Sequence, residues 1–214
     1  MAFNSEIAGI RKEYSSHSLL EESVEKDAIK QFSSWWEEAL RSQVDEINAM
    51  TLATCSLASK PSARIVLLKG FSQEGFIFFT NYHSKKGMEL MQNPNACLVF
   101  FWKELERQVR IEGTVKKISE QESDEYFNIR PFQSRISAFS SPQSQVIESR
   151  EALENIVEQN KRIYATEIMR PPHWGGFVVN PELIEFWQGR PNRLHDRLLY
   201  TRQDNNWIIE RLAP

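Results

Sequence analysis

The chain has 214 residues, of which 41% are hydrophobic, and this is enough to build the core of one compact domain. Its formal net charge of −3 argues against a general nucleic-acid binder, which carries a broad basic footprint. The longest apolar run, ACLVFFW at 96–102, is too short to span a bilayer, and the N-terminal residues lack the apolar core of a signal peptide. We therefore expect a cytoplasmic protein that binds neither nucleic acid nor membrane.

The charge is unevenly distributed along the chain. Residues 60–117 hold ten Lys and Arg against five Asp and Glu, although the whole chain is acidic. A local positive excess of this size suits a small anionic ligand better than a long polyanion. The two cysteines, Cys55 and Cys97, lie in apolar runs, as buried thiols of a reducing compartment do.

The first helix is predicted over residues 27–47, after a polar stretch at 1–26 that has no clear period. Apolar side chains recur at helical spacing in 27–47, at Ile29, Phe32, Trp36, Leu40 and Val44. We interpret 1–26 as a mobile N-terminal arm and 27–214 as a single domain.

From residue 50 onward the pattern changes to strands rich in β-branched and aromatic residues. Strands are predicted at 50–57, 63–71, 75–81, 96–102, 107–118, 177–189, 197–203 and 206–213. Helices are predicted at 84–94, from the capping box at Ser119 through Phe127, and at 147–162. The short connections favour antiparallel pairing, so we expect an α+β fold that is mainly β, a β-barrel with helices packed outside.

Several common motifs are absent from the sequence. It has no GxGxxG, no GxxxxGK[ST], no HExxH and no GxSxG, which removes the usual nucleotide cradles, zinc-protease sites and nucleophile elbows. The four histidines are scattered, so nothing supports a metal site.

Two basic segments are candidate anion sites. In ARIVLLKGF, a lysine at a strand end ordinarily just faces water. If Arg64 and Lys69 bind ligands instead, strict alternation places them on opposite faces, so they would serve two ligands, or one ligand only if the strand twists or ends between them. Further on, a strand meets a helix at a cluster of hydroxyl and ammonium groups. A helix N-terminus with such groups favours an anion, but this segment taken alone is better explained as a solvated charged turn. The cluster contains Thr80, Ser84, Lys85 and Lys86.

Polar residues of the middle of the chain form a second candidate set. Tyr126 and Arg130 are four residues apart on a predicted helix, and Ser134 follows in a turn. An arginine, a phenol and a hydroxyl on one surface can bind a second phosphate. Gln108, in a strand of alternating character, can hydrogen-bond the edge of a polar ring, and Gln143 with Ser144 adds polar contacts from a loop.

The stretch WQGRPNRLHDR at 187–197 concentrates cationic groups in a short segment. In an extended segment Arg193, His195 and Arg197 project to one side, while Asp196 on the other face does not neutralise them. Three such groups on one face repel one another unless an anionic or π-rich ligand lies against them. This segment therefore favours a functional interpretation.

Taken in order, these segments resemble the pyridoxine/pyridoxamine 5′-phosphate oxidase family of FMN enzymes. The resemblance runs from RKEY at residue 11 to the terminal RLAP, through RIVLLKG, FFTN with SKKG, LERQV, YFNIRP with QS, PQS, HWGGF and EFWQG…RLHDRLLY. It implies an antiparallel split β-barrel that works as a homodimer with FMN at the subunit interface. Phe79 stands where the family has a tyrosine, and Lys85 where it has an arginine, which keeps the charge but loses bidentate geometry.

The resemblance also assigns roles to individual residues. The implied FMN contacts are Arg64, Ile65, Val66, Leu67, Leu68, Lys69, Phe79, Thr80, Lys85, Lys86, Gln108, Gln143, Ser144, Trp187 and Arg197. The implied substrate contacts are Arg11, Tyr14, Lys69, Tyr126, Arg130, Ser134, Arg193, Leu194 and His195, with Arg193 and His195 as the catalytic pair over the pyridine ring.

The implied reaction is oxidation of pyridoxamine 5′-phosphate and pyridoxine 5′-phosphate to pyridoxal 5′-phosphate. Hydride passes to FMN, and dioxygen reoxidises the flavin to give hydrogen peroxide. Three other interpretations compete with this one. A different flavin reductase on the same fold has no reason to carry the second phosphate set. A protein that stores pyridoxal phosphate would produce no peroxide, and a nucleic-acid-binding barrel would need a continuous basic aromatic face.

Overall fold

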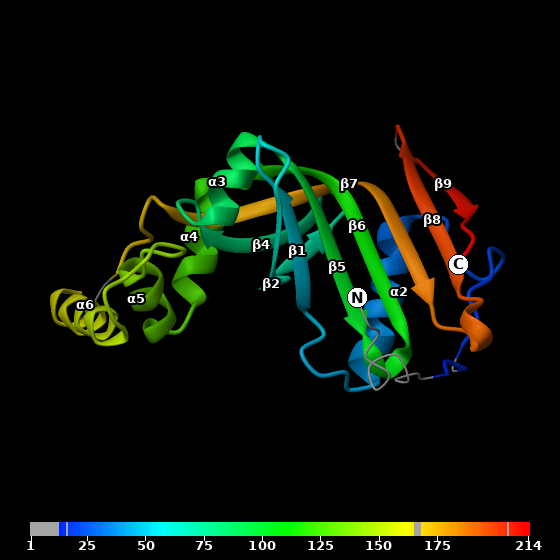
Figure 1. Ribbon diagram of the computed structural model, residues 1–214, viewed down its shortest axis with the longest axis horizontal. Helices are drawn as coiled ribbons and strands as arrows, with labels where there is room; N and C mark the ends of the chain where they lie inside the picture. Colours follow the sequence, from blue (N-terminus) through cyan, green and yellow to red (C-terminus); the bar gives the residue numbers. More distant parts are fainter. Residues whose placement is uncertain (1–12, 16, 165–167, 205) are drawn as a thin grey trace, which may run out of the picture. The chain divides into compact units, whose positions relative to one another are not determined.

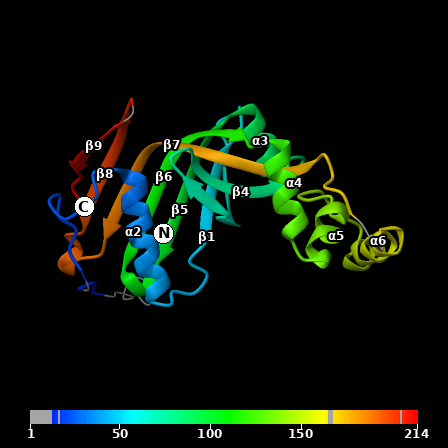
Figure 2. The same cartoon turned by 180° about the vertical axis from the view of Figure 1, so that it is seen from behind.

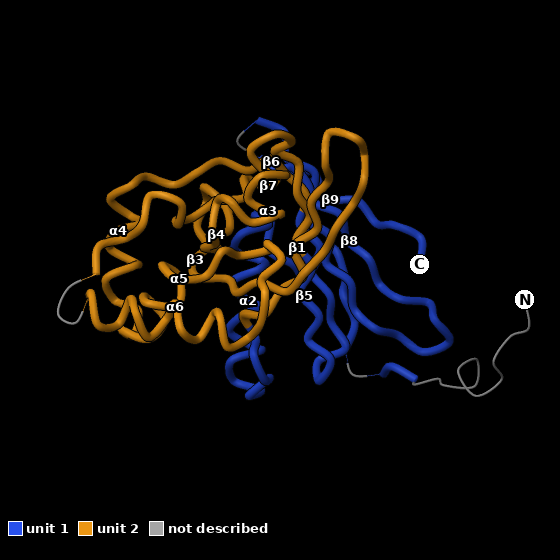
Figure 3. Tube along the Cα trace, turned by 60° about the vertical axis from the view of Figure 1, so that its left-hand side comes forward, with its two compact units in different colours: residues 1–47, 99–111, 182–214 blue, residues 48–98, 112–181 orange. Residues whose placement is uncertain are grey.

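A computed structural model describes residues 13–15, 17–164, 168–204 and 206–214, and it divides into two compact units (Figure 3). Unit 1 takes residues from 1–47, 99–111 and 182–214, and unit 2 takes residues from 48–98 and 112–181. The division of the chain into an arm at 1–26 and a single domain at 27–214 stays a prediction.

The strands form a single nine-stranded sheet, and all strand pairs with a known register are antiparallel, as predicted. The order is β2-β1-β5-β6-β7-β4-β3, with β8 paired to β7 and β9 to β8. The strands are β1 (Ala49–Cys55), β2 (Pro61–Leu67), β3 (Gly70–Ser72), β4 (Gly75–Asn81), β5 (Asn95–Trp102), β6 (Arg107–Lys117), β7 (Trp174–Gln188), β8 (Asp196–Gln203) and β9 (Asn206–Arg211).

Five α-helices and two short 3₁₀ helices accompany the strands in the described residues. They are α2 (Ala28–Arg41), α3 (Lys85–Gln92), α4 (Glu120–Ile129), α5 (Phe132–Ser140), α6 (Arg150–Ile163), η1 (Lys103–Leu105) and η2 (Pro191–Arg193). Among the residues that the structure describes, no helix combines the length and apolar character that a membrane span requires.

In unit 1, the predicted amphipathic helix is present as α2 with the N-cap Asp27, but it ends at Arg41 and not at residue 47, and Leu40 of the predicted apolar face is exposed. Figure 2 shows α2 lying across one face of the strands of this unit. Phe32 contacts Phe100, and Trp35 meets Phe186 edge-on at 5.2 Å between ring centroids. Burial of these rings holds the helix against the sheet, since each aromatic side chain removes a large apolar area from water.

In unit 2, α4, α5 and α6 gather at one end (Figure 1). Their core consists of Phe127, Ile136, Ile168 and Trp174, which are all buried. The capping box predicted at Ser119 is present. The Ser119 hydroxyl accepts a hydrogen bond from the Glu122 amide, and the Glu122 carboxylate accepts one from the Ser119 amide. This helical end places the side chains of α4 and α5 beside β4 and the start of β7.

Three local predictions differ from the structure. The strand predicted over 63–71 is two strands, since β2 ends at Leu67 and β3 begins at Gly70. Ser134 lies in α5, a helix the sequence reading missed, and not in a turn. Arg130 is the C-cap of α4 with extended backbone angles, because Pro131 follows and disfavours the helical conformation at 130.

Candidate active site

A cavity of about 630 Å³ in unit 2 collects many of the residues singled out from the sequence. Its volume lies within the range of small-molecule sites. The predicted residues that line it are Ile65, Val66, Leu67, Lys69, Phe79, Thr80, Lys86, Tyr126, Arg130, Ser134 and Gln143. The lining residues that sequence reasoning did not select are Asn81, Pro131, Ser137, Ala138, Ser141 and Trp174.

Arg130 is the cation at one end of this cavity. Its Nη1 atom is buried and has no hydrogen-bond partner among the described residues. Burial lowers the pKa of the guanidinium, while the nearby Tyr126 acts in the opposite direction. An unsatisfied buried donor costs about 1–3 kcal/mol, so an oxygen of an anionic ligand would stabilise this arrangement. Lys69, Tyr126 and Ser134 line the same cavity and add an ammonium group and two hydroxyls.

A stack of aromatic rings forms the wall beside Arg130. Phe79 stacks on Tyr126 with 3.9 Å between ring centroids, and on Trp174 with 5.4 Å. The guanidinium carbon of Arg130 lies 4.5 Å from the centroid of the Trp174 ring. Phe79, the residue that departs from the family pattern, therefore serves here as an apolar ring in a stack.

Lys86 is a further cation in the cavity lining, in addition to Arg130 and Lys69. Its Nζ donates to Thr80 Oγ1 and to Gln143 Oε1, both at 3.3 Å. Burial lowers the pKa of the Lys86 ammonium, and the charge of Arg64 lowers it further. Ser84 caps the helix that carries Lys86, since its hydroxyl accepts from the Gly87 amide. A helix N-terminus with this basic residue in its first turn favours a bound anion.

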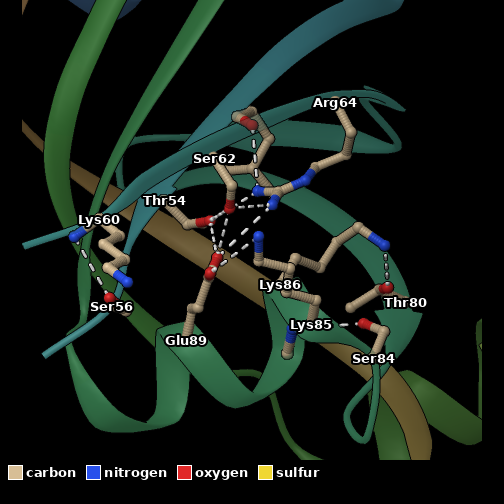
Figure 4. A network of polar contacts seen from close by, with 12 residues as sticks. Thr54, Ser56, Lys60, Ser62, Arg64, Thr80, Ser84, Lys85, Lys86 and Glu89 are labelled. Carbon is tan, nitrogen blue, oxygen red and sulfur yellow. Dashed lines mark hydrogen bonds and ion pairs between the residues drawn. The ribbon is translucent and has the colours of Figure 1, made fainter. Parts of the chain in front are cut away.

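Arg64 lies in the same unit but outside the cavity lining, and a hydrogen-bond network holds it toward α3 (Figure 4). Its Nη1 donates to Thr54 Oγ1 and its Nη2 to Ser62 Oγ, both at 2.6 Å. Both hydroxyls donate in turn to the buried Glu89 carboxylate, at 2.5 and 2.7 Å. Burial would raise the pKa of Glu89, but these hydrogen bonds and the charges of Lys85 and Arg64 outweigh it and lower the pKa.

In unit 1, Arg193 and His195 lie at the loop between β7 and β8. His195 Nδ1 accepts from the Arg190 amide at 3.1 Å, so the neutral ring carries its hydrogen on Nε2. Burial and the charge of Arg193 lower the pKa of His195. Trp187 and Tyr14 pack near the imidazole, with ring centroids 4.6 and 6.0 Å from it.

The prediction that Arg193, His195 and Arg197 project together from an extended segment is wrong. Arg193 ends η2 with a positive φ of 61°, so strict alternation does not hold there. Arg197 lies on β8 and forms a bidentate pair with the buried carboxylate of Glu185, at 2.8 and 3.1 Å. The positive charge of Arg197 is therefore balanced within unit 1, which the sequence reading did not foresee.

Asp196 pairs with two cations other than Arg193, His195 and Arg197, the three that it was predicted not to neutralise. It lies 3.5 Å from Arg190 and 2.8 Å from Arg211. Arg193, in contrast, is exposed and forms no ion pair with the residues that the structure describes. Considering only partners within the described part of the chain, Arg193 is thus the arginine of this segment that has no carboxylate partner.

The other predicted residues lie outside the cavity lining. In unit 2, Leu68 is buried, Lys85 is exposed and 3.9 Å from Glu89, and Ser144 is exposed with a φ of 72°. Gln108, Trp187, Leu194 and Arg197 belong to unit 1, where Leu194 is 68% exposed. Arg11 falls outside the described residues.

Sequence reasoning missed three buried residues that hold the candidate groups in place: Trp174, Glu89 and Glu185. A signal for Glu185 was present, because a carboxylate inside the apolar run LIEFW needs a cationic partner when it is buried. Arg110 provides a second partner for it at 2.5 Å. Glu89 and Trp174 carried no comparable signal, since their roles depend on contacts between distant segments.

The fold and the cavity define an antiparallel split-barrel protein with a pocket lined by cationic side chains, and comparisons with known proteins show its family. Residues 36–163 match the family model described as pyridoxamine 5′-phosphate oxidase, and residues 174–214 match the pyridoxine 5′-phosphate oxidase C-terminal dimerisation region. The chain therefore belongs to the pyridoxamine 5′-phosphate oxidase family, and the matched dimerisation region supports a homodimer.

Individual relatives agree with this assignment. The chain is 57% identical over 210 residues to a pyridoxine/pyridoxamine 5′-phosphate oxidase of Microcystis aeruginosa, covering 97% of this chain and 98% of that protein. It is 54% identical to the Salinibacter ruber protein of the same name, covering 98% and 100%. Among solved structures, PhzG from Burkholderia lata in complex with tetrahydrophenazine-1-carboxylic acid aligns with a TM-score of 0.88 at 29% identity, covering 94% of this chain and all of that one. The predicted split-barrel fold is thereby confirmed.

Proposed function

We propose that this chain is an FMN-dependent oxidase that converts pyridoxamine 5′-phosphate and pyridoxine 5′-phosphate to pyridoxal 5′-phosphate. The observation that carries the proposal is the buried, unpartnered Nη1 of Arg130 in a cavity that Lys69, Tyr126 and Ser134 also line. This set suits the phosphate of a small substrate, because a guanidinium, an ammonium and two hydroxyls offer several donors to a dianion. The names of the relatives, at 54–57% identity over nearly the whole chain, support the same substrates.

The residues near Lys86 fit the FMN cofactor in this proposal. Arg64 and Lys85 pair with the Glu89 carboxylate, while Lys86 donates to Thr80 and Gln143, so the three cations keep an excess positive charge that a phosphate offsets. In the described part of the sheet, β2 is an edge strand that pairs only with β1, and Val66 lines the cavity from it. The outer edge of such a strand offers backbone donors and acceptors to a planar polar ring. Bound FMN supplies the two-electron acceptor, which dioxygen regenerates with release of hydrogen peroxide.

The side chains of this protein bind, orient and hold protons in the reaction. The Arg130 group fixes the substrate phosphate, and Arg193 with His195 lies over the pyridine ring and orients it. His195 is neutral near pH 7 because its pKa is lowered, so its Nε2–H donates a hydrogen bond. The amine substrate, dioxygen and water give the aldehyde, ammonia and hydrogen peroxide, while the alcohol substrate and dioxygen give the aldehyde and hydrogen peroxide.

We further propose that the working protein is a homodimer with FMN at the interface and that both chains contribute residues to each site. The match to the family's C-terminal dimerisation region supports this arrangement. Trp187, Arg193, His195 and Arg197 all lie within the matched region, residues 174–214.

The visible absorption spectrum tests the proposed function directly. The purified protein should show a flavin band that bleaches when pyridoxamine 5′-phosphate is added without oxygen and returns when oxygen is admitted. A band that persists would contradict the substrate and indicate another flavin enzyme of this fold. A colourless protein that takes up no added FMN would contradict the cofactor and favour a binding protein.

A further inference from the structure

Trp174, in the aromatic wall of the cavity, lies against the guanidinium of Arg130. Trp174 begins β7 and is 6% exposed, and its ring lies 4.5 Å from the guanidinium carbon of Arg130. Trp is the strongest partner of a cation among the aromatic side chains, and the contact strengthens when the pair is shielded from water. Trp174 is therefore the main aromatic contact of the Arg130 charge.

Arg130 has no other anchor of comparable strength in the described residues. It forms no ion pair with a described carboxylate, and its Nη1 is buried without a hydrogen-bond partner. Its second aromatic neighbour, Phe127, is farther away, at 5.9 Å. An arginine side chain has several rotatable bonds, so without an anchor its guanidinium would occupy many positions. The face of Trp174 restricts it to one.

Trp174 itself is held firmly in the structure. Its backbone nitrogen donates to Pro171 O, and its carbonyl accepts from Arg170 Nη1 at 2.8 Å. Arg170 in turn pairs with Asp124 on α4 at 2.6 Å. The Trp174 ring also stacks on Phe79 and belongs to the buried core of the helical end. A side chain fixed from both its backbone and its ring is a rigid platform.

We propose that Trp174 is a positioning residue of the substrate phosphate site, which holds the Arg130 guanidinium by its ring face so that Nη1 points at the phosphate. This inference rests on the proposed function, because it takes the anion in the cavity to be the phosphate of a B6 substrate. Phe79 extends the platform to Tyr126, whose ring lies 3.9 Å from it. The stack thereby orders two donors of the phosphate site together.

The test compares Trp174→Phe and Trp174→Leu with a matched pair at another tryptophan. The guanidinium carbon of Arg202 lies 5.9 Å from the ring centroid of Trp207 on β9, which belongs to unit 1 and lies outside the cavity. Trp207→Phe and Trp207→Leu therefore control for the loss of an indole that contacts an arginine. KM and kcat for pyridoxamine 5′-phosphate should separate the two positions. We expect KM to rise about threefold in Trp174→Phe and about tenfold in Trp174→Leu, with kcat changed less than about twofold. The Trp207 variants should change neither constant.

Two binding measurements distinguish positioning from general damage. Titration calorimetry with pyridoxal 5′-phosphate should show weaker binding in the Trp174 variants, while titration of the apoprotein with FMN gives unchanged affinity. Unphosphorylated pyridoxamine should be oxidised by the wild type and the Trp174 variants with the same kcat/KM. An equal loss with both substrates, or a fall in kcat at unchanged KM, would overturn the role.

Folding and function can be separated in this experiment. Trp174→Phe keeps an aromatic ring in the core, so it tests the proposal even if Trp174→Leu does not fold. A wild type that fails to oxidise pyridoxamine 5′-phosphate would remove the proposed function itself. A wild type that turns over normally, together with Trp174→Phe of unchanged KM, would remove only the role of Trp174.

Discussion

Arg130 differs from Arg107 and Arg197, two other arginines that are at least partly buried, in what balances its charge. Arg107 pairs with Glu38 at 2.6 Å, and Arg197 pairs with Glu185 at 2.8 Å. Arg130 has an aromatic face and a buried nitrogen with no partner among the described residues. A cation that pairs with no described carboxylate, at the wall of a cavity, is available for an external anion, and this is why Arg130, and not the paired Arg107 or Arg197, marks the site.

Replacement of Arg130 by lysine should weaken substrate binding while leaving the reaction step nearly intact. Lysine keeps the charge but loses the planar, multidentate geometry and the stacking on Trp174. Loss of a charge-assisted hydrogen bond costs about 1.5–3 kcal/mol, so KM should rise between about tenfold and a hundredfold with kcat little changed. Steady-state kinetics check this. The exposed Arg150→Lys on α6 is the control, and a normal KM in Arg130→Lys would contradict the assignment.

The lowered pKa of His195 predicts the pH range in which its ring stays neutral. Nδ1 of the neutral ring accepts a hydrogen bond from the Arg190 amide, so protonation of Nδ1 breaks this hydrogen bond. Because burial and Arg193 lower the pKa, the neutral form should persist through neutral pH and be lost only below the ordinary value near 6.5. In Arg193→Gln the pKa should rise toward that value, as measured by NMR titration of the histidine ring protons. An unchanged or lower pKa in this variant would count against the electrostatic coupling.

At the scale of single residues, the sequence predicted which residues line the cavity better than which residues pair with each other. Lys69, Tyr126, Arg130 and Ser134 were selected together, and they do line one cavity. The pairing of Arg197 with Glu185 was missed, because the two residues are brought together by strand pairing, which local alternation does not reveal. Their roles toward FMN and substrate stay predictions.

At the scale of elements, α3 is fixed to the β1–β2 hairpin by the network around Glu89. The helix contributes the carboxylate, β1 contributes Thr54, and β2 contributes Ser62 and Arg64 (Figure 4). The start of the helix is set by Ser84, whose hydroxyl accepts from the Gly87 amide at 3.2 Å. Two predicted phosphate cations, Lys85 and Lys86, therefore derive their position from a polar network between elements.

Replacement of Thr54 by valine should destabilise this junction. The hydroxyl accepts from Arg64 and donates to Glu89, so its loss leaves buried polar groups unsatisfied at a cost of about 1–3 kcal/mol. Urea unfolding should show that decrease in the free energy of unfolding. Thr51→Val, in the same strand but outside this network, should change the free energy of unfolding by less than about 0.5 kcal/mol. Equal effects at the two positions would show that the network contributes nothing.

Elements with a strong local signal were predicted correctly, and those that depend on a proline or on a strand break were not. The capping box at Ser119 and the amphipathic face of 27–47 gave the starts of α4 and α2. Residues 132–140 contain three serines after Pro131, a composition typical of a turn, and yet they form α5. Burial of Ile136 in the core of the helical end outweighs the low helix propensity of these serines.

At the scale of the whole molecule, most of the predicted site residues fall into two sets that differ in what the structure shows. One set lines a single cavity, and the other lies in the matched dimerisation region at 174–214. In a homodimer with two-fold symmetry each interface contact occurs twice, so two equivalent sites are expected per dimer. Because both chains of the proposed homodimer contribute to each site, activity of a heterodimer of two different variants can test this sharing.

Mixing two inactive variants should restore activity if both chains contribute to each site. Arg130→Gln removes the phosphate cation of the cavity, and Arg193→Gln removes a catalytic group of the dimerisation region. In a heterodimer with shared sites, one site carries both substitutions and the other carries none. Random re-association after mild denaturation makes half of the dimers heterodimers, so activity should recover to about a quarter of the wild-type value. Each variant refolded alone is the control, and mixtures that stay inactive while heterodimers form would show that each site is built within one chain.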